Sequence, residues 1–159
     1  MGKRSVKTDK TVYQLAREKA GLSREKASEK LVFLSPDRIE RIESRKSMPE
    51  PDEIIAMAAA YGDVRLANRY CTTECPIGRK YVPPVGEKNL PVIALEVVNA
   101  LNVLEKEKNR LIEIAIDDRI SEDEASDFRE IEDALRRISS ATEALKLWIE
   151  ERSITEKQN

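Results

Sequence analysis

The sequence predicts an all-α protein with a set of short helices followed by a hairpin of two long ones. Three observations support this prediction. The 159 residues are 36% charged and only 4% aromatic, and they include just 5 glycines, a composition typical of helical soluble proteins. Apolar residues recur at helical spacing along most of the chain. A stretch of four prolines and two glycines at residues 76–91 divides this helical pattern in two.

Five short helices are expected in the first part, residues 1–75. Their apolar residues stand three or four positions apart, a spacing that places them on one helical face. Ser23 and Ser35 have side chains that cap helix N-termini, and Gly21 and Gly62 suit the residues that follow helix C-termini. The expected helices cover residues 12–20, 24–31, 52–61 and 64–71, with the third of the five beginning at Pro36.

The stretch at 76–91, PIGRKYVPPVGEKNLP, is expected to be a linker that holds no helix. Proline has no backbone N–H to donate and clashes with the preceding helical turn, and glycine costs conformational entropy in a helix. The predicted organisation is therefore an N-terminal domain at 1–75, this linker, a helical hairpin at 92–152 and a tail at 153–159.

The hairpin is expected to consist of helices at 92–117 and 121–152. Ser121 and Glu124 have the spacing of a capping box at the start of the second helix. Only residues 118–120 separate the two helices. A connection this short makes the helices antiparallel neighbours.

Heptad spacing along both long helices predicts coiled-coil packing between them. In the second helix this seam is Phe128, Ile131, Leu135, Ile138, Thr142, Leu145 and Ile149. In the first helix it is Val97, Leu101, Leu104, Leu111 and Ala115, interrupted by Lys108. Further apolar residues lie beside the seams, at Leu95, Val98, Ile112, Ile116, Leu147 and Trp148.

This apolar surface is wider than one partner helix can cover, and soluble proteins rarely expose a patch of that size. We therefore expect two hairpins to pack face to face as a four-helix bundle, which makes the chain a homodimer. The alternative is that the same residues pack the hairpin onto the N-terminal domain of its own chain.

The net charge of −2 conceals an asymmetry along the chain. Residues 1–48 carry 13 basic against 7 acidic side chains, whereas residues 71–159 carry 13 basic against 19 acidic ones. The first part can therefore approach a polyanion that the second part repels.

Several classes of protein are excluded by composition. No apolar run reaches the roughly 20 residues of a membrane-spanning helix, and the basic, polar start of the chain is unlike a secretory signal. Histidine is absent, which excludes His-based catalytic triads and His metal ligands. With two cysteines and no disulfide framework, a cytoplasmic location is expected. We find no catalytic constellation and expect no enzyme activity and no cofactor.

No metal site is expected either. Cys71 and Cys75 stand four residues apart, but two thiolates are only half of a zinc site; two small buried apolar residues are the preferred interpretation. The acidic segment at 117–124 lacks the spacing of a calcium-binding loop.

Residues 15–43, LAREKAGLSREKASEKLVFLSPDRIERIE, resemble the lambda-repressor-like, Cro/CI-type (XRE family) helix-turn-helix regulators. The resemblance covers about residues 10–70. It implies that helices two and three form a DNA-binding unit, with helix three in the major groove, and that the protein is a dimeric repressor of transcription. The matching features are Arg17 before Gly21-Leu22-Ser23, then Glu29-Lys30-Leu31, Ile39 and Arg41-Ile42-Glu43.

The resemblance also implies roles for individual residues. Arg24 matches a position that contacts phosphate, and Arg41 matches one that contacts bases, where arginine suits guanine. Arg17 and Glu43 match a structural salt bridge between helices one and three. The residues expected at double-stranded DNA are Arg24, Ser35, Asp37, Arg38, Arg41, Arg45 and Lys46.

The turn and the third helix depart from the family pattern. The turn at 32–34 is one residue longer than usual and lacks the common glycine. Pro36 and Asp37 occupy the first base-reading positions, where proline offers no polar group and aspartate is repelled by phosphate. A second interpretation therefore stays open, in which the helix-turn-helix scaffold binds a protein and has weak or no DNA binding.

Overall fold

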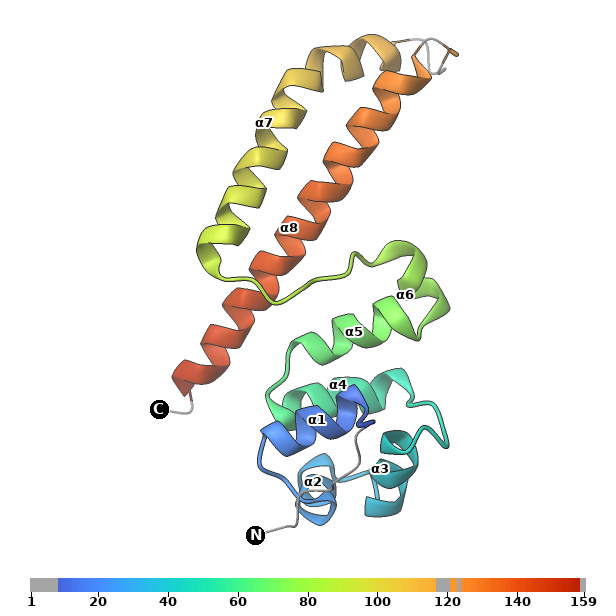
Figure 1. The fold of residues 1–159 in the computed structure, drawn as a ribbon, viewed down its shortest axis with the longest axis vertical. Helices are drawn as coiled ribbons and strands as arrows, with labels where there is room; N and C mark the ends of the chain where they lie inside the picture. Colours follow the sequence, from blue (N-terminus) through green and yellow to red (C-terminus); the bar gives the residue numbers. More distant parts are fainter. Residues whose placement is uncertain (1–8, 117–120, 123, 158–159) are drawn as a thin grey trace. The chain divides into compact units, whose positions relative to one another are not determined.

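The structure is a computed structural model that describes residues 9–116, 121–122 and 124–157, with only the backbone described for 154–157. Within these ranges the chain forms eight helices and no strand, as the all-α prediction expects (Figure 1). The helices are α1 (Val12–Lys19), α2 (Arg24–Leu31), α3 (Pro36–Glu43), α4 (Pro51–Tyr61), α5 (Arg65–Thr73), α6 (Pro76–Tyr81), α7 (Leu90–Ala115) and α8 (Ala125–Lys157).

The chain divides into two compact units. One contains α1 to α6 up to Val82, together with the end of α8 from Glu151. The other extends from Pro83 to Glu150 and contains α7 and most of α8. We call them the N-terminal domain and the hairpin.

The short helices begin where the sequence places capping residues. The Ser23 hydroxyl accepts a hydrogen bond from the Lys26 backbone N–H at 3.2 Å, and the Ser35 hydroxyl accepts one from the Arg38 backbone N–H at the same distance. Each bond satisfies one of the N–H groups left free in a first helical turn. Gly62 follows α4 with a φ of 66°, a left-handed conformation that glycine adopts at little cost.

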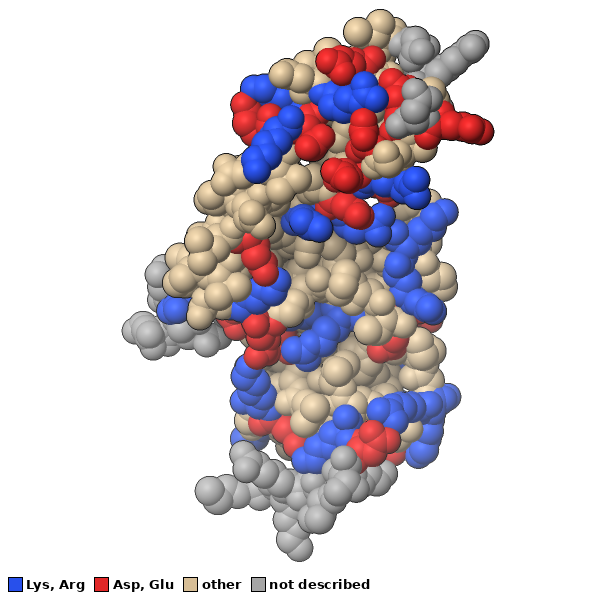
Figure 2. Space-filling view, turned by 45° about the horizontal axis from the view of Figure 1, so that its top comes forward, with Lys and Arg blue, Asp and Glu red and all other residues tan. Residues whose placement is uncertain are grey.

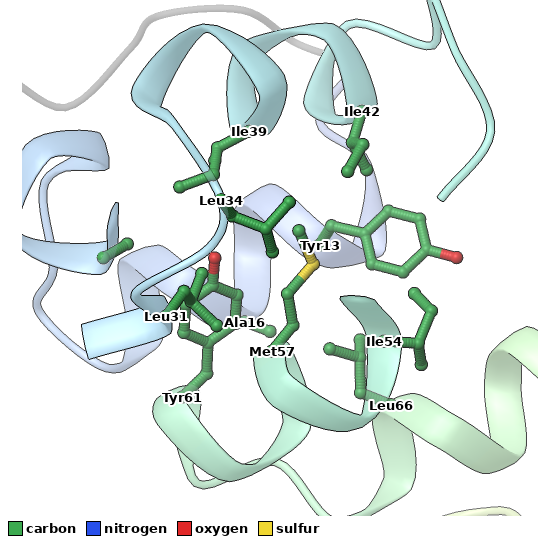
Figure 3. Packing of buried hydrophobic residues seen from close by; sticks show 11 residues of the cluster. Tyr13, Ala16, Leu31, Leu34, Ile39, Ile42, Ile54, Met57, Tyr61 and Leu66 are labelled. Atoms are coloured by element: carbon green, nitrogen blue, oxygen red, sulfur yellow. The ribbon is translucent and has the colours of Figure 1, made fainter. Parts of the chain in front are cut away.

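The core of the N-terminal domain forms around α4. Met57 on this helix is fully buried, and Ile39 on α3 and Ala27 on α2 are equally inaccessible. Figure 3 shows side chains from α1, α3 and α4 converging on this centre. The buried cluster is Tyr13, Ala16, Ala27, Leu31, Leu34, Ile39, Ile42, Ile54, Met57, Tyr61 and Leu66. Its burial fixes which face of α3 remains outside.

The expectation that 76–91 holds no helix is wrong for its first part, because residues 76–81 form α6. Pro76 stands in the first turn, where a missing N–H costs nothing, and the Cys75 Sγ accepts the cap bond from the Gly78 N–H. A Cβ built on Gly78 would lie 2.2 Å from the Cys71 carbonyl oxygen. The glycine therefore permits α6 to pack tightly against α5.

In the hairpin, α7 and α8 run side by side in opposite directions (Figure 1). The Arg110 guanidinium on α7 donates to the Asp127 carboxylate on α8 at 2.6 Å. Small side chains line the contact, with Ala100 on α7 and Ala134, Ala141 and Ala144 on α8 all buried.

Part of the predicted heptad seam is wrong. On α7 the buried or half-buried stripe is Ile93, Val97, Ala100, Leu104, Glu107, Leu111 and Ile114. On α8 it is Phe128, Ile131, Ala134, Ile138, Ala141, Leu145 and Trp148. Five predicted members are exposed instead, namely Leu101, Ala115, Leu135, Thr142 and Ile149. Alanines take the places of three of them, at Ala100, Ala134 and Ala141, and their small side chains allow closer helix approach. Ile114 and Trp148 take the places of Ala115 and Ile149.

The long helices also differ slightly from their expected ranges. The expected turn at 118–120 lies outside the described residues. α8 begins at Ala125 rather than Ser121 and continues to Lys157, beyond the expected end at Arg152. Half of the capping-box pattern is present, because the Glu124 carboxylate accepts a hydrogen bond from the Ser121 N–H at 3.0 Å.

Candidate nucleic-acid interface

Helices α2 and α3 present the candidate interface. Ile39 and Ile42 turn one face of α3 into the core, so the opposite face, with Asp37, Glu40 and Arg41, looks outward. Asp37 and Arg41 are exposed and Glu40 is half-buried. An outward helix face with an exposed arginine can enter a DNA major groove.

A buried ion pair joins α1 to α3. The Arg17 Nε donates to Glu43 Oε1 at 2.5 Å, and its Nη2 donates to Glu43 Oε2 at 3.0 Å. Arg17 also donates to the Leu22 carbonyl at 2.6 Å, which holds the entry to α2. Burial lowers the pKa of Arg17, but the hydrogen bonds and charge of Glu43 outweigh it and raise the pKa overall. The geometry is that of the structural bridge that the family resemblance implied.

Arg24 shares the same carboxylate. Its Nε donates to Glu43 Oε2 at 2.9 Å, and its side chain is 36% exposed. One face of the guanidinium is thereby tied to the domain at the start of α2. Its position at the first turn of α2 is where the preceding helix of such a motif meets the phosphate backbone.

Arg38 is occupied within the domain. Its Nε and Nη2 donate to both oxygens of Glu53 at 2.7 and 2.6 Å. Its remaining bonds go to the Ser47 hydroxyl at 2.6 Å and the Met48 carbonyl at 3.0 Å. The side chain thus connects α3 to the start of α4, and four of its five N–H donors are used.

The other two basic candidates also have carboxylate partners. Arg45 forms a two-bond pair with Asp9 at 2.7 and 3.2 Å. Lys46 donates to Glu40 at 3.1 Å, and this hydrogen bond is the main cause that lowers the pKa of Glu40. Both pairs are exposed and gain little stability in water, so a phosphate can replace the carboxylates.

Arg41 differs from these residues. It is exposed on the outward face of α3, and no carboxylate in the described part of the chain forms an ion pair with it. Ser35, the N-cap of α3, is also exposed. The structure therefore places the predicted DNA-binding residues on one motif, and among the basic ones only Arg41 has no ion-pair partner in the described part of the chain.

The sequence interpretation missed the acidic partners. Glu53 and Asp9 stand 15 and 36 residues from the arginines that they bind. No periodic signal connects positions so far apart, because their contact depends on how the loops close the domain.

The turn between α2 and α3 has an unusual backbone. Val32 has a φ of 61° and a ψ of −47°, and the Phe33 N–H donates to the Leu31 carbonyl at 2.7 Å. This bond closes a γ-turn of the rare kind with positive φ. The side chains of Val32 and Phe33 are 89% and 63% exposed. The longer turn thus presents an apolar tip beside α3.

The cysteines lie on different helices, Cys71 in α5 and Cys75 at the cap of α6. Burial, followed by the charge of Cys75, raises the pKa of the Cys71 thiol. Among the described residues, no three acidic or cysteine side chains are grouped so as to hold a metal ion.

Comparison with known proteins finds a family match for the helix-turn-helix region. Residues 14–67 match the family described as helix-turn-helix, a stretch that runs from α1 into α5. No curated protein and no solved structure matches the chain. A search of the described helices finds none long and apolar enough to cross a membrane. Residues 14–67, from α1 into α5, are thus similar to the Cro/CI-type helix-turn-helix family of DNA-binding regulators, as the resemblance in the sequence implied.

Proposed function

We propose that this chain is a sequence-specific transcriptional regulator, a dimeric repressor that reads duplex DNA with Arg41. The observation that supports this role is the exposed Arg41 on the outward face of α3, which has no ion-pair partner among the described residues. The other basic candidates of the motif are held by carboxylates. A guanidinium that keeps its donors available can pair with O6 and N7 of one guanine. The proposed base contact therefore depends on a single residue.

The neighbouring residues hold the motif on the duplex. Arg24 has Nη donors outside its bond to Glu43 and would contact a phosphate at the start of α2. Arg45 and Lys46 would exchange their exposed carboxylate partners for phosphates. Asp37 and Ser35 stand at the first turn of α3, where Asp37 can accept a hydrogen bond from cytosine N4. Arg38 is assigned to holding α3 on α4, because its donors are already used.

Dimerisation through the hairpin completes the proposal. Large apolar side chains on α7 are exposed, among them Leu95 at 70% and Ile112 at 62%. A two-fold dimer would cover such a surface and present two copies of α3 to a near-palindromic site.

The experiment begins with selection of bound duplexes from a random pool by the full chain. Binding of the selected duplex is then measured for Arg41→Ala and Arg41→Lys over a series of salt concentrations. Arg41→Ala should lose roughly 1–3 kcal/mol of preference at one base pair. Arg41→Lys should keep the salt dependence and lose most of that preference, because an ammonium group cannot make the paired contact.

Two further variants separate the roles. Arg24→Ala should weaken all duplexes alike and lower the salt slope by about one unit. Lys30→Ala, an exposed cation at the far end of α2, is the matched control and should change neither quantity. A random pool that yields no preferred duplex, or an Arg41→Ala protein with unchanged preference, would overturn the proposal.

A second candidate function is supported by the apolar tip of the turn. Val32 and Phe33 are exposed next to α3, and Asp37 and Glu40 reduce the positive charge of its outward face. A protein partner could pack on this tip. In that case the chain binds no preferred duplex, and Phe33→Ser abolishes partner binding.

A further inference from the structure

We propose that two copies of this chain pair through the outer face of α7 in antiparallel orientation, with Glu105 of each copy beside Lys108 of the other. This inference rests on the dimer in the proposed function and gives it a surface, a direction and a register. It concerns α7 alone and requires nothing of the DNA-binding residues.

Helix α7 carries a second heptad stripe next to the one that packs on α8. Its members alternate four and three residues apart, the spacing of a coiled-coil seam. All of them are exposed, in contrast to the inner stripe, which is buried or half-buried. The outer stripe is Ala94, Val98, Leu101, Glu105, Lys108, Ile112 and Ala115.

The exposed outer face of α7 is unusually apolar for a surface in contact with water. Val98 and Leu101 are 54% and 50% exposed, and Leu95 and Ile116 flank the stripe at 70% and 79%. From Leu90 to Leu104 the only charged residue is Glu96. Figure 2 shows a broad surface with few charged side chains over the beginning of α7. Such a patch marks a protein contact.

The two charged members of the stripe determine the direction of pairing. In a parallel pair each layer contains the same residue from both copies, so Glu105 would face glutamate and Lys108 would face lysine. Like charges in a seam are unfavourable. In an antiparallel pair with the two-fold axis between these positions, each layer joins Glu105 of one copy to Lys108 of the second copy. The charges are then complementary in both central layers.

The apolar members fall into register with this choice. When Glu105 faces Lys108 of the second copy, Leu101 faces Ile112 and Val98 faces Ala115. All four outer layers are thus apolar, and a large side chain meets a smaller or equal one in each. Within one chain Lys108 pairs with Glu105 one turn away, so both charges already lie together on this face. Dimerisation would exchange partners across the axis without leaving a charge unpaired.

The test is charge exchange in the full chain, followed by sedimentation at several concentrations. Glu105→Lys and Lys108→Glu should each raise the dimer dissociation constant at least tenfold, because each places like charges in both central layers. The double variant E105K/K108E should restore dimerisation, since lysine again faces glutamate. An equal mixture of the two single variants should form a heterodimer. Lys106→Glu, on the same helix but outside both stripes, is the matched control and should behave as the original chain.

A crosslinking experiment tests direction independently. In a chain whose own thiols are removed by Cys71→Ala and Cys75→Ser, the variants Leu101→Cys and Ile112→Cys are prepared separately. Oxidation should crosslink the mixture of the two and neither variant alone. Crosslinking of Leu101→Cys with itself would indicate a parallel pair and overturn the inference.

Other outcomes are equally decisive. A full chain that stays monomeric at micromolar concentration, or single charge variants that dimerise normally, would contradict the pairing. These results are separate from those of the proposed function: a chain that dimerises as described but selects no duplex would contradict DNA reading and leave the α7 pairing intact. A chain that keeps its base preference but does not pair through α7 would contradict the pairing and leave the proposed DNA reading intact.

Discussion

At the scale of single residues, the helix-turn-helix motif is notable for its internal compensation of charge. Glu43 holds Arg17 and Arg24, and Glu53 holds Arg38. The buried carboxylate of Glu43 stays favourable because it accepts hydrogen bonds from both arginines; loss of one partner of such a pair costs roughly 3–5 kcal/mol. The motif is thereby stiffened, and Arg41, which has no ion-pair partner among the described residues, keeps its charge available for a ligand.

Val32 offers a test of backbone strain at this motif. A residue with a Cβ at positive φ costs about 1–2 kcal/mol, and the Val32 side chain is almost fully exposed. Val32→Gly should therefore raise the free energy of unfolding by about 0.5–1 kcal/mol, after the greater chain entropy of glycine in the unfolded state is subtracted. Urea unfolding of the full chain measures it. Val32→Ala keeps the strain and is the control; a glycine variant less stable than the alanine variant would show that the γ-turn is not strained.

At the scale of elements, α6 is a helix in a segment whose proline and glycine content predicts a linker. Proline and glycine interrupt helices, and their density predicted a linker over 76–91. Pro76 instead occupies the first turn, and Gly78 lies against the Cys71 backbone, where a Cβ would not fit. The missing N–H of proline and the missing Cβ of glycine are therefore compatible with this helix.

This packing makes the effect of Gly78→Ala opposite to helix propensity. Propensity alone favours alanine by about 1 kcal/mol. The new Cβ would meet the backbone of Cys71, which cannot move without separating α5 from α6, so we expect destabilisation of roughly 1–3 kcal/mol. Gly86→Ala is the matched control, because nothing lies within 4 Å of its added Cβ. Denaturant unfolding compares the two, and a Gly78→Ala protein as stable as Gly86→Ala would contradict the close approach.

Much of this level could be predicted from sequence for a local reason. Capping serines and the left-handed Gly62 act within one helical turn, so the helices α2 to α4 were located correctly. The Arg17–Glu43 bridge was found only through the family resemblance. The Arg38–Glu53 pair and the α7–α8 seam depend on tertiary closure. The apolar stripes of the hairpin are wide enough to permit two different seams between α7 and α8. The observed seam includes buried alanines such as Ala134 and Ala141, which carry little hydrophobic signal in the sequence.

At the scale of the whole molecule, two units with different kinds of stability occur in one chain. The N-terminal domain encloses its own core around Met57, and it carries the basic excess suited to a polyanion. The hairpin is acidic and leaves apolar side chains on α7 in solvent. Its stability should therefore depend on association, whereas that of the N-terminal domain should not.

Heating the full chain at two protein concentrations tests this division. We expect two transitions, of which the hairpin transition moves to higher temperature as concentration rises, because dimerisation stabilises the folded form by mass action. The N-terminal transition should stay fixed. Glu105→Lys should lower only the temperature of the hairpin transition, and Val32→Gly should raise only that of the N-terminal transition. The two variants therefore assign each transition to its unit. Circular dichroism follows both, since each unit is helical. A single transition, independent of concentration and shifted by both variants, would mean that the units unfold as one and that the apolar face of α7 is covered within the chain.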